Sequence, residues 1–250
     1  MTTTIVLGDG GLGHAVVEGC RTRGDDVRVL GRPVPGPHDP AAFAGATLVV
    51  EASRGPSVLP NLRAAVEGGV RRDVVATTAW DADRDEVQAI LRRSGAVAVA
   101  APNFSLGVAL FSRLVDAAVG LFGRVEAFDP YPVEWHRRAK ADRPSGTAAM
   151  LAGRIVDAHP RATSESLEVV SIRAGSAPGM HLVGFDAPGE TVELRLTARD
   201  RSAYVAGILA AADWLARAPR TPGLHPFDPV VDELLGEAPV APSAPATAAA

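Results

Sequence analysis

The sequence predicts an α/β protein, in which a Rossmann-like nucleotide-binding domain is followed by an α+β domain with a mixed sheet. In the first half, short apolar segments rich in β-branched residues alternate with helix-like segments. This alternation is typical of a parallel sheet with helices on both faces. In the second half, residues 191–198 alternate strictly between apolar and polar side chains, which is typical of a sheet with one covered face.

The elements can be placed in order along the chain from these patterns. In the first half, we expect strands at 3–7, 27–30, 47–53, 74–78 and 97–101, and helices at 13–23, 58–67 and 86–93. In the second half, we expect helices at 106–122, 145–159 and 202–217, and strands at 124–131, 167–173, 181–186 and 191–198.

Composition narrows the class of function. The chain has 250 residues, of which 47% are hydrophobic, so a sizeable core can form. The net charge is -4 with both signs interspersed, which argues against a nucleic-acid-binding protein. The six histidines are scattered, so no cluster indicates a metal site. Cys20 is the single cysteine, which excludes an internal disulfide and fits the reducing cytoplasm.

Residues 1–7 and 237–250 bear on targeting and on disorder. Residues 1–7 lack the basic and apolar regions of a signal peptide, and no apolar run reaches the ~18 residues of a membrane helix, so we expect no membrane association. Residues 237–250 are mostly small residues and proline. Such a segment cannot contribute to a core, and we expect it to be disordered.

A glycine-rich motif lies between the first strand and the first helix. It reads Gly8, Asp9, Gly10, Gly11, Leu12, Gly13. Glycines at these spacings let the chain turn tightly and approach a pyrophosphate, while the helix N-terminus supplies N–H groups to the anion. The motif predicts a dinucleotide site, and the alternative is a purely structural strand-to-helix turn.

The end of the second strand bears on cofactor choice. It reads Leu30, Gly31, Arg32, without the acidic residue that usually binds the ribose of NAD. Arg32 can instead pair with a 2′-phosphate, so we expect NADPH, with NADH as the alternative. A solvated loop arginine is the other interpretation of Arg32.

Residues 134–148 combine three features suited to an acidic substrate. Ser145 is expected to cap a helix, so that the N–H groups of Gly146 and Thr147 and the Thr147 hydroxyl bind a carboxylate. Lys140 adds a positive charge, and His136 supplies a proton donor near neutral pH. Both are expected in a loop leading to the helix, outside the core. Each feature alone has a structural explanation, but the combination indicates reduction of an acidic substrate.

Several segments resemble the motifs of one enzyme family. Residues 134–148 follow the pattern E-x-H-H-x-x-K-x-D-x-P-S-G-T-A, 101–108 follow A-x-N-F-S-x-G-V, 76–78 follow G-T-T, and 172–185 follow V-R-x-G…G-x-H…F. These are motifs of the 4-hydroxy-tetrahydrodipicolinate reductases, also called dihydrodipicolinate reductases, which the chain resembles over nearly all of residues 3–235. Three departures stand out. Arg137 replaces the second histidine, Ala76 replaces a glycine, and the phosphate loop is shorter and lacks an arginine.

The resemblance implies an activity, a domain organisation and an assembly. The activity is reduction by NADPH or NADH of a cyclic imine dicarboxylate, 4-hydroxy-tetrahydrodipicolinate, to tetrahydrodipicolinate in lysine and diaminopimelate biosynthesis. Residues 1–106 and 213–236 would form the dinucleotide-binding domain, with a substrate-binding and tetramerisation domain inserted at 107–212. A homotetramer is implied, and the open strands at 167–173 and 191–198 are candidates for its contacts.

The motifs and the resemblance together assign the site residues. Catalysis is assigned to His136 and Lys140, and substrate binding to Arg137, Ser145, Gly146 and Thr147. Cofactor binding is assigned to Gly8, Asp9, Gly10, Gly11, Leu12, Gly13, Arg32, Ala76, Thr77, Thr78, Pro102, Asn103, Phe104 and Ser105.

Two other functions remain open at this stage. A homologous reductase of specialised metabolism would act on a different cyclic imine or ketimine, and Arg137 favours it because an arginine at a substrate-facing position binds an anionic group. A nucleotide-sensing or scaffolding protein without catalysis is the second alternative. The presence of both His136 and Lys140 argues against it, because a binding module needs neither.

Overall fold

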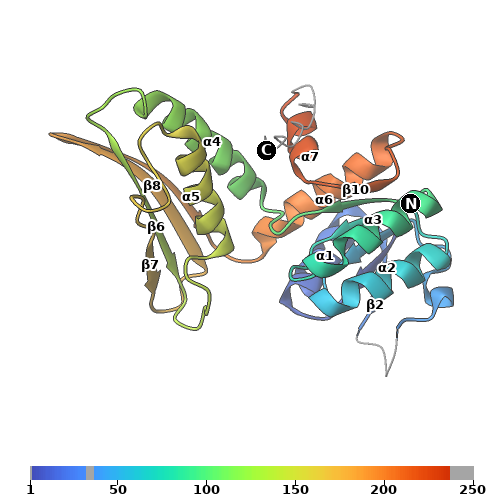
Figure 1. The fold of residues 1–250 in the computed structure, drawn as a ribbon. Helices are drawn as coiled ribbons and strands as arrows, with labels where there is room; N and C mark the ends of the chain where they lie inside the picture. The colour runs from blue at the N-terminus through green and yellow to red at the C-terminus, as the bar shows by residue number, and fades with distance from the viewer. Residues whose placement is uncertain (1, 32–36, 237–250) are drawn as a thin grey trace. The chain divides into compact units, whose positions relative to one another are not determined.

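The chain folds into two units, each with its own sheet (Figure 1). The computed structural model describes residues 2–31 and 37–236, so Arg32 and the tail expected at 237–250 lie outside the described residues. The first unit comprises Met1–Pro102 and the chain from Ile208 onward, and the second comprises Asn103–Gly207. Residues 103–106 therefore join the second unit and 208–212 the first, whereas the sequence placed both segments on the other side of the junction.

The first unit contains a six-stranded parallel sheet with the order β10-β5-β4-β3-β1-β2. The Rossmann-like expectation is confirmed. Burial explains why these segments form strands, since β3 and β5 are buried along their whole length. The strands are β1 (Thr3–Leu7), β2 (Asp26–Leu30), β3 (Leu48–Glu51), β4 (Arg72–Val75), β5 (Val97–Ala100) and β10 (Gly223–His225).

Helices cover both faces of this sheet. The chain moves from β1 to β2 in one direction and from β3 through β4 to β5 in the other, and right-handed crossovers then put α1 on one face and α2 and α3 on the other. Val58 and Leu62 of α2 and Leu91 of α3 pack together in one cluster of core residues. The bounds are α1 (Gly11–Arg23), α2 (Val58–Glu67), α3 (Arg84–Ser94), and the 3-10 turns η1 (Pro40–Phe43), η2 (Gly55–Ser57) and η3 (Asp81–Asp83).

The second unit is a four-stranded mixed sheet with two helices on one face (Figure 1). The order is β7-β6-β8-β9, and only the β6–β7 pair is parallel. Phe111 and Val115 of α4 and Ile155 of α5 pack on Phe185 of the sheet. The bounds are α4 (Leu106–Phe122), β6 (Asp129–His136), α5 (Gly146–Ala158), β7 (Val170–Arg173), β8 (Gly179–Ala187) and β9 (Glu190–Ala198).

The expected strand at 124–131 is wrong in position. Residues 124–128 form turns, and β6 runs instead over Asp129–His136. Its buried inward positions are Pro132, Glu134 and His136, so the alternation that marks a strand is carried by proline and ionisable residues and is invisible to hydropathy. His136 is consequently the last residue of a strand and is buried, not part of an exposed loop.

The C-terminal segment returns to the first sheet. Helix α6 (Ser202–Arg217) leads to β10, which pairs with β5, and α7 (Asp228–Leu234) follows. Arg23, at the end of α1, ties α6 to the unit, because its guanidinium reaches Asp213 at 2.9 Å and Asp25 at 2.6 Å. Within the described part of the chain, none of the helices is long and apolar enough to cross a bilayer.

Arg23→Ala is expected to lower the free energy of unfolding by about 1–3 kcal/mol, because it leaves the buried Asp25 carboxylate without its cation. Arg21→Ala on the same helix is the matched control. Arg21 pairs with Glu18 in an exposed position, so its removal should cost less than about 0.5 kcal/mol. Urea unfolding of both variants checks this, and equal losses would contradict the role given to Arg23.

Candidate active site

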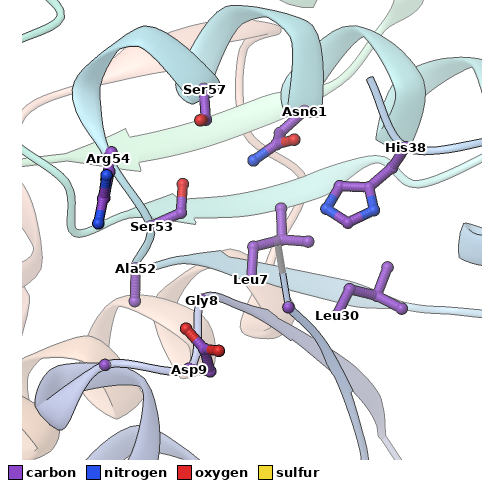
Figure 2. Close-up of a pocket in the computed structure, with 12 residues that line it drawn as sticks. Leu7, Gly8, Asp9, Leu30, His38, Ala52, Ser53, Arg54, Ser57 and Asn61 are labelled. Atoms are coloured by element: carbon purple, nitrogen blue, oxygen red, sulfur yellow. The ribbon is translucent and has the colours of Figure 1, made fainter. Parts of the chain in front are cut away.

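A cavity opens in the first unit at the carboxyl ends of β1, β2 and β3 (Figure 2). The order of the sheet reverses between β1 and β3, and ligands of such sheets bind at this switch point. The cavity volume is about 390 Å³. Its lining residues are Leu7, Gly8, Asp9, Gly10, Leu30, Gly31, His38, Ala52, Ser53, Arg54, Ser57 and Asn61.

The glycine motif forms one wall of this cavity and allows the backbone to pack closely. Gly8 has φ +106°, and a Cβ atom there would lie 2.6 Å from the Ala52 carbonyl oxygen. A Cβ on Gly13 would lie 2.1 Å from the Gly8 carbonyl oxygen, so α1 can approach the turn only with glycine there. Gly10 is the N-cap of α1 and makes no side-chain cap bond. No acidic residue lies in the first turn of α1, formed by Gly11, Leu12 and Gly13, so this helix terminus suits a phosphate group.

Several lining residues were not identified from the sequence. Figure 2 shows Ser57 and Asn61 on one side of the cavity, with Asp9 on the opposite side and His38 at one end. Ser53 and Arg54 follow β3 directly, and polar residues at the end of a central parallel strand are a signal that can be read from sequence. His38 carries no such signal, because it follows the second strand by eight residues.

Glu51 holds the loops at one edge of the cavity. Its buried carboxylate accepts hydrogen bonds from the Ser53 backbone N–H at 2.8 Å and from Asn61 Nδ2 at 2.7 Å. Thr77 Oγ1 lies 3.2 Å from the Glu51 carbonyl oxygen. Burial raises the pKa of Glu51, against the effect of these neutral hydrogen-bond donors.

The segment after β4 is a loop, whereas the sequence predicted a strand as far as residue 78. Ala76 donates its N–H to the Glu51 carbonyl oxygen at 2.8 Å, Thr77 is buried and Thr78 is exposed. Ala79 then takes φ +61°, a value that residues with a side chain rarely adopt. This reversal lies in the loop after β4, directly after the exposed Thr78.

In the second unit, Asn103 joins the starts of the two helices. Its Oδ1 accepts the Ser105 N–H at 2.8 Å, and its Nδ2 donates to Thr147 Oγ1 at 3.3 Å. Ser105 caps α4 through the Val108 N–H, and Phe104 is buried. Pro102 is the last residue of the first unit. The segment assigned to the cofactor thus contacts a residue assigned to the substrate.

The start of α5 has the expected geometry for an anion site. Ser145 is the N-cap and accepts the Ala148 N–H at 3.2 Å, which confirms the predicted cap. No atom lies within 4 Å of the position of a Cβ on Gly146, so the first turn is open. Lys140 Nζ is held by Asp142 at 2.8 Å. The helix terminus and the ammonium group lie in one connected segment and both attract a carboxylate.

Glu134 lies beneath this segment and is fully buried. Its Oε1 accepts hydrogen bonds from the Ser145 N–H at 3.0 Å, from Ser171 Oγ at 2.6 Å and from Arg173 Nη2 at 2.7 Å. Burial alone would raise the pKa of Glu134, but these hydrogen bonds outweigh it and lower the pKa to about 2. The carboxylate is therefore ionised and fixes both the helix cap and β7.

His136 is held between two oxygen atoms. Its Nδ1 lies 3.3 Å from the Pro178 carbonyl oxygen, and its Nε2 lies 3.1 Å from Glu134 Oε2 without the alignment of a directed hydrogen bond. Burial lowers the pKa of His136, while Glu134 and Pro178 act in the opposite direction. With 7% of its surface exposed, His136 is a buried group.

His181 completes a cluster that the sequence did not predict. It lies opposite Glu134 in the β6–β8 register, and its ring centroid is 5.2 Å from that of His136. Burial, together with His136 and other cations nearby, lowers the pKa of His181 to about 4. His136 and His181 are thus far apart in sequence but close together in space. Arg137, assigned to substrate binding, is exposed.

Comparison with known proteins identifies the family. Residues 107–230 match the family model described as dihydrodipicolinate reductase, C-terminus. A protein of Nocardia farcinica named 4-hydroxy-tetrahydrodipicolinate reductase is 36% identical over 205 residues, which cover 73% of this chain and 80% of that protein. The chain belongs to the dihydrodipicolinate reductase family. A protein of Chromobacterium violaceum, also named 4-hydroxy-tetrahydrodipicolinate reductase, is 34% identical over 194 residues, which cover 70% of this chain and 70% of that protein.

A solved structure agrees at the level of the fold. Dipicolinate-bound dihydrodipicolinate reductase from Paenisporosarcina sp. TG-14 superposes with a TM-score of 0.71 over 90% of this chain and 98% of that chain, at 17% identity. Membership of the dihydrodipicolinate reductase family makes the chain an oxidoreductase that uses a nicotinamide cofactor. The glycine cradle and the open terminus of α1 fit such a cofactor.

His181 makes stability depend on pH. A histidine in the unfolded chain titrates near 6.5, whereas the pKa of folded His181 is about 4, so between these values the unfolded chain binds more protons. The free energy of unfolding is therefore highest above pH 6.5, where His181 is neutral in both states. It falls by about 3 kcal/mol as the pH is lowered from 6.5 to 4. In the His181→Gln variant, the free energy of unfolding measured with urea should fall less steeply between pH 6.5 and pH 4 than it does in the wild type. The exposed His14→Gln variant should keep the wild-type slope, and an unchanged slope in His181→Gln would refute the assignment.

Proposed function

We propose that the chain reduces 4-hydroxy-tetrahydrodipicolinate to tetrahydrodipicolinate with NADPH or NADH, as in lysine and diaminopimelate biosynthesis. The observation that carries the proposal is the cluster of His136, Lys140 and the capped start of α5 around one buried carboxylate, Glu134. The curated relatives carry the name of this reaction. No observation on the described residues favours the alternative substrates of specialised metabolism or a non-catalytic role.

Substrate binding follows from the charges around α5. The substrate is a dicarboxylate, and one carboxylate fits the free N–H groups of Gly146 and Thr147 at the helix start. Lys140 supplies the compensating charge, and Asp142 fixes its ammonium group. The Thr147 hydroxyl is oriented by Asn103. Positive groups around the ring make it a better hydride acceptor.

The chemical step requires one hydride and one proton after water has left the 4-position. The nicotinamide cofactor supplies the hydride when it is bound. His136 supplies the proton to the ring carbon next to the one that is reduced, and Glu134 stabilises the protonated imidazole at 3.1 Å. Both ring nitrogens of His136 face protein oxygens, so transfer requires the ring to turn away from one of them.

The assembly and compartment are proposed with the function. β7 and β9 are the two edges of the second sheet, and Val170 and Ile172 of β7 are exposed. Open edges and exposed apolar side chains need covering, which supports a homotetramer built on this sheet. A small-molecule biosynthetic activity and a single cysteine support a cytoplasmic location.

The direct test is oxidation of NADPH with freshly generated 4-hydroxy-tetrahydrodipicolinate, followed by absorbance and by identification of the product. The expected result is stoichiometric formation of tetrahydrodipicolinate. Turnover of monocarboxylate cyclic imines in preference to this substrate would assign the chain to another reductase of the family. Absence of turnover with every cyclic imine would refute the reductase function.

For cofactor choice, Arg32→Ala is expected to weaken NADPH binding roughly tenfold or more and to leave NADH binding nearly unchanged, because one charge-assisted contact to the 2′-phosphate is worth about 1.5–3 kcal/mol. Fluorescence titration with each cofactor measures the two dissociation constants. Equal losses for both cofactors would show that Arg32 does not bind the phosphate. Arg21→Ala, which removes an exposed arginine of α1 that pairs only with Glu18, serves as the control.

For the chemical step, His136→Asn is expected to lower turnover by about 10²–10⁴, the usual contribution of a positioned acid. Lys140→Ala should lower both turnover and substrate affinity, because the ammonium group attracts the substrate in the bound complex and in the transition state. Thermal unfolding must accompany the kinetics, since His136 is buried. Near-normal turnover in either variant would contradict its role.

A further inference from the structure

Three buried ligand-type atoms lie close together in the second unit. Glu134 Oε2, His136 Nε2 and His181 Nδ1 all lie within 4.8 Å of one another. None of the three has a directed hydrogen bond among the described residues, although the residues are only 0%, 7% and 7% exposed. Buried polar atoms are nearly always hydrogen-bonded, so three neighbouring atoms without a directed hydrogen bond indicate a missing ligand.

The sheet itself builds this cluster. Glu134 and His136 are two residues apart on β6 and therefore share a face, and His181 on β8 is the register partner of Glu134. All three side chains stand on paired strands and not on loops. A site on such a frame is held in place before any ligand arrives.

Two of the three atoms, Glu134 Oε2 and His136 Nε2, face each other directly. When His136 donates its Nδ1 proton to the Pro178 carbonyl oxygen, its Nε2 carries a lone pair. That lone pair lies 3.1 Å from the ionised Glu134 Oε2. The pair needs a positive charge between or beside its atoms, and either a proton or a metal ion can supply it.

We propose that Glu134, His136 and His181 bind a zinc ion. Two imidazole nitrogens and one carboxylate oxygen are the ligand set of three-protein-ligand zinc sites, with a fourth position open. This set does not suit Mg²⁺ or Ca²⁺, which prefer oxygen ligands. Ligand atoms of a tetrahedral zinc site are about 3.4 Å apart. The Glu134–His136 pair, at 3.1 Å, is already close to this spacing, and His181 Nδ1 lies within 4.8 Å of both atoms.

Neighbouring charges set the strength of the site. Arg173 already pairs with Glu134 Oε1, and Lys140 is held by Asp142 at the surface. These cations oppose a divalent ion, so binding is reversible and is removed by a chelator. Because protons compete for the same three atoms, affinity rises with pH.

Zinc binding has a consequence for the reaction, which rests on the proposed function. The ion takes the Nε2 lone pair of His136 and with it the ability of this ring to carry a proton from that nitrogen. Zinc therefore inhibits the reductase, and inhibition is lifted when the metal is removed. The binding itself does not depend on the reaction.

The test uses the full-length protein without a histidine tag. Calorimetric titration with ZnCl₂ is expected to show one site per chain, and Co²⁺ bound at the same site should give visible absorption bands typical of tetrahedral nitrogen and oxygen ligands. His181→Gln should weaken binding at least tenfold and remove the Co²⁺ bands. His225→Gln removes a histidine from the first unit and should bind as the wild type does.

The outcomes separate the two proposals. Absence of a stoichiometric site in the wild type, or unchanged zinc affinity in a folded His181→Gln protein, overturns the zinc site. Circular dichroism establishes that this variant is folded, and His136→Gln provides a second variant with the same expectation. If zinc binds with one site per chain but leaves turnover unaffected, the zinc site stands and the proton-donor role of His136 fails.

Discussion

The buried carboxylate of Glu134 is the interaction on which the second unit depends. One oxygen accepts three hydrogen bonds from two separate segments: one from the cap of α5 at Ser145, and two from Ser171 and Arg173 of β7. The other oxygen faces His136. A buried charge is tolerated only when it is paired and hydrogen-bonded. The same contacts that make Glu134 acceptable in the core therefore fix the start of α5, the parallel strand β7 and the His136 imidazole relative to one another.

The first unit also contains a buried, hydrogen-bonded carboxylate, Glu51, but its pKa is shifted in the opposite direction. Glu51 is also buried on a strand, and it holds Ser53, Asn61 and Thr77 around the cavity. Its hydrogen-bond donors are neutral, and burial raises its pKa, whereas Arg173 and two serines lower the pKa of Glu134 to about 2. The two carboxylates show how one residue type organises a loop either as a weakly acidic group or as a permanent charge.

Much of the fold could be predicted because its elements are amphipathic or wholly apolar. Helix α4 and helix α6 begin and end where the hydrophobic pattern places them, and the buried strand β5 is displaced by one residue at one end. β6 was misplaced because its inward positions carry Pro132, Glu134 and His136, so the core-facing side does not look apolar. The short strand β10 was missed, since three residues are too few for a pattern.

The candidate site was predictable where the chemistry is local. The Ser145 cap and the glycine motif depend on neighbouring residues, and both have the expected geometry. The convergence of Glu134, Arg173 and His181 could not be read from the sequence, because it depends on the strand register across more than 35 residues. Each of these three residues matches a family motif, but only the pairing of the strands shows that they share one buried network.

A double-mutant cycle between Glu134→Gln and Arg173→Met, measured by urea unfolding, tests the central role of this carboxylate. Each single variant leaves one buried charge unpaired and should lose about 3–5 kcal/mol of unfolding free energy. The double variant should lose clearly less than the sum, with a coupling energy above about 1 kcal/mol. Additive losses, or single variants as stable as the wild type, would show that Glu134 does not organise the second unit.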